Sequence, residues 1–299
     1  MTIKNRRELI FIYDVKNANP NGDPADENKP RIDEETGLNI VTDVRLKRTV
    51  RDYLYQFEGH NPENGKDIFV RTTESKKGKG IKDGKSRSLD FGQDKDEMLE
   101  NILTKCIDIR LFGGVLPLQK DSIIFTGPVQ FKMGHSMHRV AMQYIKGTGA
   151  FASKDGADQQ TFREEYILPY SLISFYGIVN ENAAKKTQLT DKDIEELKTA
   201  IWDGTKNLIS RSKFEHSPKL LMEIKYKEDN FFIGELDKYV TFESQLNDEK
   251  IRDIEDGDIN FERLADVLSG HMEKIESIEL RKNNRVKMTG FDGINYSEV

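Results

Sequence analysis

Basic residues at helical spacing are the side chains in this sequence with the clearest potential for chemistry. They follow Thr42-Asp43, a pair typical of a helix start, and they are Arg45, Lys47, Arg48 and Arg51. Guanidinium and ammonium groups one helical turn apart can contact successive phosphates, and the free amides of a helix start add neutral donors. A compact turn, NPNGDP at 19–24, lies upstream across an acidic loop. We therefore interpret the stretch 19–51 as a candidate site for a nucleic-acid backbone.

A row of basic residues on a helix more often faces solvent than binds a nucleic acid. The charge pattern of the rest of the chain decides between these two interpretations. Residues 71–87 hold seven Lys or Arg against two acids, and further basic segments lie at 211–213 and 281–287. Residues 228–266 hold thirteen acids against four bases, and the net charge is -6. This asymmetry suits a protein that binds a polyanion on one face and repels it elsewhere. The aromatic residues are too scattered for a base-stacking platform, which favours capture through backbone and shape.

Two motifs that suggest nucleotide or thiol chemistry fit poorly. The segment 78–86 resembles a phosphate-binding loop, but the pattern requires glycine where Lys79 stands, and no apolar strand precedes it. Cys106 falls on the apolar face of a predicted helix, which is typical of a structural thiol rather than a nucleophile. We predict a flexible basic loop, a core cysteine and no cofactor.

Two further groups raise the question of a metal or acid–base site. His135 and His138 lack a third ligand nearby in the sequence, and polar loop histidines that touch a ribose or phosphate are the favoured interpretation. The loop carboxylates do not have calcium-loop spacing, and we favour a solvated acidic loop for them; they are Asp23, Asp26, Asp33 and Asp43. We predict no metal site and no catalytic residue.

Hydrophobic patterning predicts the elements that position these groups. The expected order begins with a strand at 8–15, a helix at 42–58, a helix at 94–108 and a strand with a Gly-Pro interruption at 122–131. A strand pair or one long strand at 166–179, a helix at 190–207 and a strand at 219–226 follow. Taken as strand, helix, strand, strand, helix, strand with large insertions, this is a βαββαβ path, the α+β arrangement of ferredoxin-like and RNA-recognition-motif domains. Residues 59–93 are expected to be a long mobile excursion and 133–166 an inserted lobe or hairpin. A short helix at 260–269 and a basic strand pair at 275–288 complete the prediction.

Composition limits the class of protein. The chain has 299 residues with 36% hydrophobic and 33% charged residues, which describes a soluble protein of one elaborated domain or two. No apolar stretch reaches membrane-spanning length, and the first residues are too short a run for a signal peptide. The single cysteine excludes an internal disulfide and a multi-cysteine zinc site, so we predict a cytoplasmic location.

Several motifs in order resemble one protein family. They are NPNGDP at 19–24, PRID at 30–33, VTDV at 41–44, RLFGG at 110–114, TGPVQF at 126–131, ILPYSLISFYGIVN at 167–180 and PKLLMEIKY at 218–226. This series resembles the Cas-seven backbone subunit of the type I CRISPR interference complex (Cascade), a member of the RAMP superfamily. The resemblance covers about 8–226 and is greatest to subtype I-B, with I-C as the near alternative.

The resemblance implies a hand-like fold. A modified RNA-recognition-motif palm would comprise 1–58, 94–132 and 167–299, with basic fingers inserted at 59–93 and a thumb at 133–166. Several copies of such a subunit form a helical filament along CRISPR RNA, together with a RAMP end-cap subunit and large and small subunits. Each copy grips the RNA backbone and leaves the guide bases free to pair with target DNA, in antiviral defence. The subunit of type I systems is not an enzyme.

The resemblance also implies roles for individual residues. The RNA-binding set would be Asn19, Asn21, Thr42, Arg45, Lys47, Arg48, Arg51, Arg211 and Lys213, with His135, Arg139 and Lys146 at the thumb base. Target DNA would meet the fingers at Lys76, Lys77, Lys79, Lys82 and Lys85. The acidic segment 228–266 is expected to be a surface between copies, where complementary charge is needed. The alternative is a type III-like RAMP subunit that cleaves target RNA with a loop aspartate, Asp23, Asp26 or Asp33.

Overall fold

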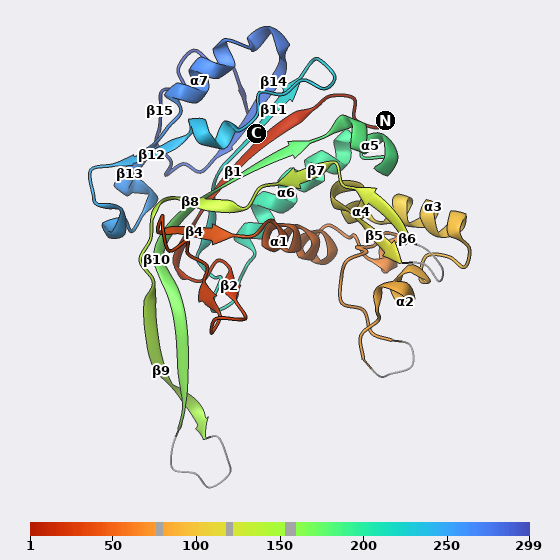
Figure 1. The fold of residues 1–299 in the computed structure, drawn as a ribbon, viewed down its shortest axis with the longest axis horizontal. Helices are drawn as coiled ribbons and strands as arrows, with labels where there is room; N and C mark the ends of the chain where they lie inside the picture. Colours follow the sequence, from red (N-terminus) through yellow and green to blue (C-terminus); the bar gives the residue numbers. More distant parts are fainter. Residues whose placement is uncertain (76–79, 118–121, 153–159) are drawn as a thin grey trace.

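The computed structural model describes residues 1–75, 80–117, 122–152 and 160–299. Its centre is an antiparallel sheet in which β1 (Arg7–Ala18) lies between β10 (Gln160–Val179) and β11 (His216–Tyr226), with β7 (Val129–Phe131) on the far side of β10 (Figure 1). The order β11–β1–β10–β7 is that of a ferredoxin-like βαββαβ unit. The predicted mixed fold is confirmed.

Two helices cover one face of this sheet. They are α1 (Asp43–Gln56) and α6 (Asp191–Lys206), and their apolar positions join the sheet in one buried cluster. In α1 the inward residues Leu46, Val50 and Leu54 recur at three-to-four-residue spacing, which is typical of a helix with one buried face. Gly204 of α6 lies against α1, where a side chain would come within 3.0 Å of Tyr53. The two helices therefore pack closely along the second half of α1.

The opposite face of the sheet is covered by the C-terminal lobe, which we define as 228–299. Its apolar residues alternate with the acids and pack on the sheet; they include Leu236, Val240, Ile251, Ile254, Ile259, Phe261, Leu264 and Leu268. The lobe contains β12 (Thr241–Ser244), β13 (Gly257–Asn260), α7 (Glu262–Ser269), β14 (Ile275–Lys282), β15 (Met288–Thr289) and β16 (Ser297–Glu298). The face that an ordinary RNA-recognition motif offers to bases is thus buried.

The predicted strand pair at 275–288 is wrong. β14 pairs with β11 in the central sheet, whereas β15 pairs with β13 in a separate three-stranded sheet. The chain leaves the central sheet after Lys282, and Arg285 in the connecting turn forms ion pairs with Asp253 and Glu255. These ion pairs connect the turn after β14 to residues 253–255, away from the central sheet.

A long β-hairpin, here called the arm, projects from the sheet (Figure 1). Its strands are β9 (Gln143–Ala152) and the first half of β10, which pair antiparallel. β10 is one strand of 20 residues that continues into the central sheet, one of the two forms expected for 166–179. The first part of the predicted insertion at 133–166 belongs to the central sheet, because β8 (Gly134–Arg139) pairs with both β10 and β4 (Leu38–Val41).

A side lobe packs beside the helices around its own apolar cluster. Its elements are α2 (Gly84–Ser88), α3 (Lys95–Lys105), α4 (Ile107–Phe112), β5 (Gly113–Pro117) and β6 (Ser122–Thr126). Phe69 and Phe91 share this cluster with Met98, Ile102 and Cys106, so the described part of 59–93 is folded rather than a free excursion. The predicted Gly-Pro interruption at 127–128 divides the strand at 122–131 into β6 and β7, and each of these pairs in a different sheet. The domain boundaries at 58, 94, 132 and 167 stay a prediction.

The remaining elements are short. β2 (Gly22–Asp23) and β3 (Lys29–Pro30) form a small hairpin before α1, and α5 (Glu181–Thr187) follows β10. Single turns of 3-10 helix are η1 (Pro62–Asn64), η2 (Leu236–Tyr239), η3 (Asp248–Lys250), η4 (Ile254–Asp256) and η5 (Met272–Lys274). Among the described residues, no helix is both long and apolar enough to cross a membrane.

Candidate nucleic-acid interface

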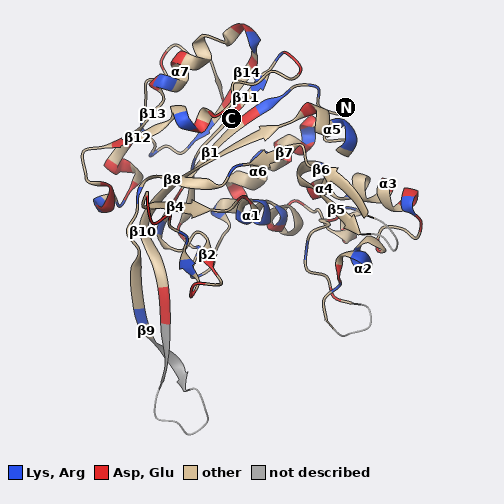
Figure 2. Cartoon of the chain, viewed as in Figure 1, with Lys and Arg blue, Asp and Glu red and all other residues tan. Residues whose placement is uncertain are grey.

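A cleft of about 660 Å³ lies between the exposed side of α1 and the segments 69–73 and 81–87. It brings together basic residues of α1 and of 71–87, two stretches that are separate in the sequence. Figure 2 shows the Lys and Arg positions on α1 and α2 in blue. The basic residues in its wall are Arg45, Arg48 and Arg51 from α1 and Arg71, Lys82 and Arg87 from the opposite side. Asn21 and Thr42 also line it, so the turn and the helix start predicted from the sequence meet in one place.

The side chains of Asn21 and Thr42 fix the start of α1. Thr42 Oγ1 accepts from the backbone N–H of Arg45 at 3.3 Å, as an N-cap residue does. The backbone N–H and the hydroxyl of Thr42 both donate to Asn21 Oδ1 at 2.9 Å. Asn21 therefore holds the 19–24 turn against the helix, which places Arg45 within the first helical turn.

The cations of α1 differ in whether a carboxylate already neutralises them. Lys47 pairs with Asp43 at 2.9 Å and Arg48 with Asp52 at 2.7 Å, both along the helix. Arg51 pairs at 3.1 Å with Asp108, which is completely buried. Across the described ranges Arg45 has no carboxylate partner. The sequence predicted a uniformly basic helix. In the structure, Lys47, Arg48 and Arg51 are each paired with a carboxylate, and Arg45 is not.

A second cation without a counter-charge lies at the 19–24 turn. Lys213 donates through Nζ to the backbone carbonyl of Asn19, and the backbone N–H of Asn19 donates to the Ser212 carbonyl at 2.9 Å. Burial lowers the pKa of Lys213 to about 8, and the charge of Arg45 adds to this shift. In the part of the chain that the structure describes, no carboxylate pairs with Lys213. Burial also lowers the pKa of Arg45.

Buried polar atoms beside these two cations lack partners. Asn19 Oδ1 and His216 Nε2 have no hydrogen bond within the described structure. His216 lines the same small internal cavity as Arg45, and burial, with repulsion from Lys213 and Arg45, holds its pKa well below the usual value. Half-buried cations without an anion are unfavourable in the free protein. The geometry therefore fits a bound anion that interacts with Arg45 and Lys213.

This site gives a pH-dependent prediction. Because an anion favours the charged form of Lys213, affinity for RNA should fall by about tenfold between pH 7 and pH 9 as a pKa near 8 is passed. Folding changes in the opposite sense. Between that pKa and the unfolded value of 10.5 the unfolded chain holds more protons, so the free energy of unfolding should rise with pH.

The control for this prediction is Lys213→Arg, which keeps the charge throughout this range. Fluorescence anisotropy of a labelled RNA, measured every half pH unit, should show the fall for the original chain and a flat profile for the variant. Equal slopes for both proteins would show that Lys213 does not carry the pH dependence.

Comparison with known proteins adds a family. The family model described as CRISPR-associated protein Cas7 matches residues 5–262. The chain belongs to the Cas7 family. A curated CRISPR-associated protein Cas7 from Haloferax volcanii is 31% identical over 313 residues, covering 96% of this chain and 90% of that protein.

Solved structures agree with the fold of this Cas7-family chain. One described as a CRISPR RNA-guided surveillance complex, pre-nicking, matches with a TM-score of 0.59 and 12% identity, over 98% of this chain and 96% of the other. A second CRISPR RNA-guided surveillance complex matches with a TM-score of 0.55 and 13% identity, over 98% and 94%. At such identities the likeness is one of fold.

The other predicted RNA-binding residues of this Cas7-family chain lie around the arm. Arg211 is half exposed and pairs with Glu165 of β10, and Lys146 of β9 pairs with Glu164 at 3.5 Å across the hairpin. His135 and Arg139 are exposed on β8. His138 is buried and stacks on Tyr170, so the two histidines do not share a site. The structure thus groups the residues of the turn, of α1 and of Lys213. His135 of β8 lies beside this group, because it pairs with Ile40 of β4, whereas Lys146 lies on the arm.

The predicted DNA-contacting lysines are only partly within the structure. Lys76, Lys77 and Lys79 lie outside the described residues. Lys82 pairs with Asp90 at 2.6 Å, and Lys85 is exposed on α2.

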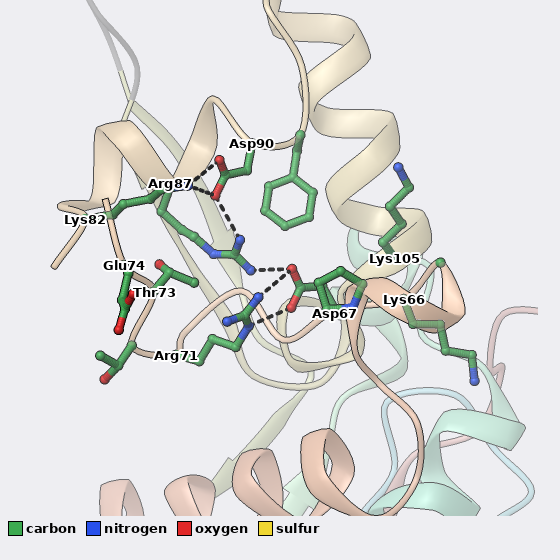
Figure 3. Close-up of a pocket in the computed structure, with 13 residues that line it drawn as sticks. Lys66, Asp67, Arg71, Thr73, Glu74, Lys82, Arg87, Asp90 and Lys105 are labelled. Carbon is green, nitrogen blue, oxygen red and sulfur yellow. Dashed lines mark hydrogen bonds and ion pairs between the residues drawn. The ribbon is translucent and has the colours of Figure 1, made fainter. Parts of the chain in front are cut away.

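An ion-pair network that the sequence did not reveal folds the 66–90 segment (Figure 3). Asp67 accepts from Arg71 at 2.7 Å and from Arg87 at 2.7 Å, and Asp90 accepts from Arg87 at 3.1 Å. Arg87 also lies over the ring of Phe91, with 4.7 Å between the guanidinium carbon and the ring centre. These cations are compensated, so the second cleft of about 520 Å³ that they line carries less free charge than its composition suggests. The signal in the sequence was the short spacing of opposite charges, four residues from Asp67 to Arg71 and three from Arg87 to Asp90.

The acidic loop before α1 also has a structural explanation. Asp23 pairs with Arg31 and Asp26 with Lys29, each at 2.7 Å. Asp33 accepts from the backbone N–H groups of residues 35 and 36, which lowers its pKa. Among the described residues, the acidic group close enough to share a metal is instead Glu195, Glu223 and Glu279, and the ammonium group of Lys198 contacts all three.

The same loop contacts the base of the arm. Tyr166 of β10 donates its hydroxyl hydrogen to Glu27 at 3.0 Å, and the ammonium group of Lys29 lies 5.3 Å from the centre of the Tyr166 ring. Asn19 Nδ2 donates to the Asn28 carbonyl at 2.7 Å. The loop thereby joins the turn near Lys213 to the arm.

Proposed function

We propose that this Cas7-family chain is a non-catalytic backbone subunit of a type I CRISPR RNA-guided surveillance complex, of subtype I-B or the similar I-C. It binds the phosphate backbone of CRISPR RNA at the start of α1, in the cytoplasm. The observation that carries the proposal is the pair of cations Arg45 and Lys213, half-buried beside the turn without a counter-charge. A phosphate supplies the missing anion, and the neutral donors of a turn and helix start add hydrogen bonds.

Further features of the proposal concern assembly. Several copies follow one RNA in a helical filament and present guide bases to target DNA, in company with end-cap, large and small subunits. In this proposal 1–58, 94–132 and 167–299 form the palm, 59–93 the fingers and 133–166 the thumb. The projecting arm and the cleft on the same chain support a subunit that contacts RNA at more than one point. The acids of 228–266 that face solvent are available for contact between copies (Figure 2).

The second candidate is cleavage of target RNA by a loop aspartate. Asp23 and Asp26 are held in ion pairs, and Asp33 accepts hydrogen bonds from its own loop. These contacts give each carboxylate a role in folding the loop, which favours the non-catalytic proposal.

The test is purification of the protein with its operon partners, followed by two assays on one preparation. We expect short RNA of one size class to co-elute and to dissociate as salt is raised, because counterion release makes phosphate contacts salt-dependent. We also expect complementary RNA to stay intact in magnesium. Absence of bound RNA and of salt-sensitive RNA affinity would overturn the proposal. Regularly spaced cleavage that is lost on Asp23→Ala, Asp26→Ala or Asp33→Ala would establish the second candidate instead.

A further inference from the structure

Three exposed aliphatic side chains share the cleft with the cations. Val44 is 66% exposed, Val70 49% and Ile81 70%, and all three line the cleft. They come from three different segments: the start of α1, the 69–73 segment and the residues before α2. Single exposed apolar residues are ordinary, but a group of them around one cleft marks a binding surface.

The combination of aliphatic and cationic groups indicates the kind of ligand. A chain of phosphates alone would gain nothing from Val70 or Ile81. A nucleobase, by contrast, offers a flat apolar face beside an anionic backbone, and single-stranded RNA is recognised through such unstacked bases. We propose that the cleft binds an unstacked nucleobase of single-stranded RNA against Val44, Val70 and Ile81, with the adjoining phosphate near Arg45. This inference rests on the proposed function and adds a base contact to it; the base held in the cleft is one that is not presented to target DNA.

The buried carboxylate of Asp108 orders both the apolar and the cationic side of the cleft. Asp108 accepts from Arg51 Nε at 3.1 Å and from the backbone N–H of Val70 at 3.0 Å. It also accepts from the N–H of Phe69 at 2.8 Å. The backbone at Val70 and the guanidinium of Arg51 are therefore held in place relative to each other before any ligand binds. Such preorganisation lowers the ordering cost of binding.

The guanidinium groups around the cleft are similarly restrained. Arg51 lies over the ring of Phe112, with 5.2 Å between the guanidinium carbon and the ring centre, and Arg71 lies 4.8 Å from the centre of the Tyr55 ring. Asp67 holds Arg71 through Nε and one terminal nitrogen. The cleft volume of about 660 Å³ falls within the range of roughly 300–1,000 Å³ for pockets that hold small molecules, so a nucleotide can be accommodated.

The test compares two ligands of equal charge. One is a single-stranded RNA of uniform sequence, and the other is an abasic ribose-phosphate oligonucleotide of the same length. The variant Val70→Ser with Ile81→Ser removes aliphatic surface and keeps every cation. We expect its affinity for the RNA to fall about tenfold with an unchanged salt dependence, and its affinity for the abasic ligand to stay the same.

Two controls keep the result interpretable. Ile124→Ser changes a residue that is 70% exposed on β6 and does not line the cleft, and it should leave both affinities unchanged. If the double variant shows no thermal unfolding transition, and so does not fold, the single variant Val44→Ser repeats the test at an exposed position on α1.

The outcomes separate this inference from the proposed function. If the original chain binds neither ligand, the proposed function fails. If it binds both and the serine variants lose affinity for both or for neither, RNA binding stands and the base contact is overturned. Preference of the cleft for an acidic, apolar peptide over RNA, lost in the serine variants, would assign it to a protein partner and would also overturn the inference.

Discussion

Replacing Arg45 and Lys213 together with methionine should lower the affinity for single-stranded RNA by about a hundredfold or more without lowering stability. Each charge-assisted contact with a phosphate contributes about 1.5–3 kcal/mol, and two are removed. In the free protein both cations are half-buried without a counter-charge, which burial disfavours, as the lowered pKa of Lys213, about 8, indicates. Loss of these charges therefore removes an unfavourable burial from the folded state.

The measurement is RNA affinity as a function of salt, together with urea unfolding of each protein. The slope of log affinity against log salt should become shallower by about 0.7 for each phosphate that the variant no longer neutralises. Lys238→Met, an exposed lysine on η2 that pairs with Glu235, is the matched control and should change neither quantity. Unchanged RNA affinity in the double variant would show that these cations do not meet the RNA.

Asp108→Ala should produce the largest loss of stability, about 3–5 kcal/mol in the free energy of unfolding. Asp108 is completely buried, and its removal leaves the Arg51 guanidinium, which is only 13% exposed, without a counter-charge. It also leaves the N–H groups of Phe69 and Val70 without their acceptor. Unpaired buried donors and an unpaired buried charge are each costly.

The control is Asp52→Ala, which removes the partner of Arg48 on the exposed side of α1. Because an exposed ion pair contributes about 0–1 kcal/mol, this variant should unfold at nearly the original urea concentration. Similar losses for Asp52→Ala and Asp108→Ala would contradict the central position of Asp108. Arg51→Ala alone cannot test RNA binding, because this substitution leaves the buried carboxylate of Asp108 without its ion-pair partner.

Local patterns were enough to predict the central elements. Leu46, Val50 and Leu54 recur at helical spacing, and Thr42 is a cap residue at the predicted place, so α1 begins and faces inward as expected. The apolar run at 166–179 likewise predicted the inner part of β10. These features depend on neighbours within a few turns of chain, which is the range over which sequence patterns are informative.

Part of the charge state of the site depends on contacts between residues far apart in the sequence. The partner of Arg51 is 57 residues away, and that of Lys213 is 194 residues away. From the sequence, we expected the basic residues of these segments to be free cations. In the structure, carboxylates neutralise Lys47, Arg48, Arg51 and Arg71. Three of these pairs join residues four apart in the sequence, whereas the pairing of Arg51 with Asp108 depends on how the side lobe packs against α1.

The C-terminal lobe shows a second limit. Its acids dominated the composition of 228–266 and suggested a surface between copies. The structure shows that apolar residues between those acids, such as Val240, Ile254 and Phe261, bury the second face of the sheet. These residues lie mostly in short elements and turns and have no regular spacing. The sequence pattern therefore did not predict that they are buried.

Photo-crosslinking of the assembled ribonucleoprotein tests the central claim most directly. CRISPR RNA with photoreactive nucleotides would be bound by the protein, irradiated and digested, and the linked peptides identified by mass spectrometry. We predict crosslinks in peptides that contain the turn at 19–21, the helix start at 42–48 and Lys213. Crosslinks confined to the C-terminal lobe at 228–299, with the cleft and turn unlabelled, would contradict the account.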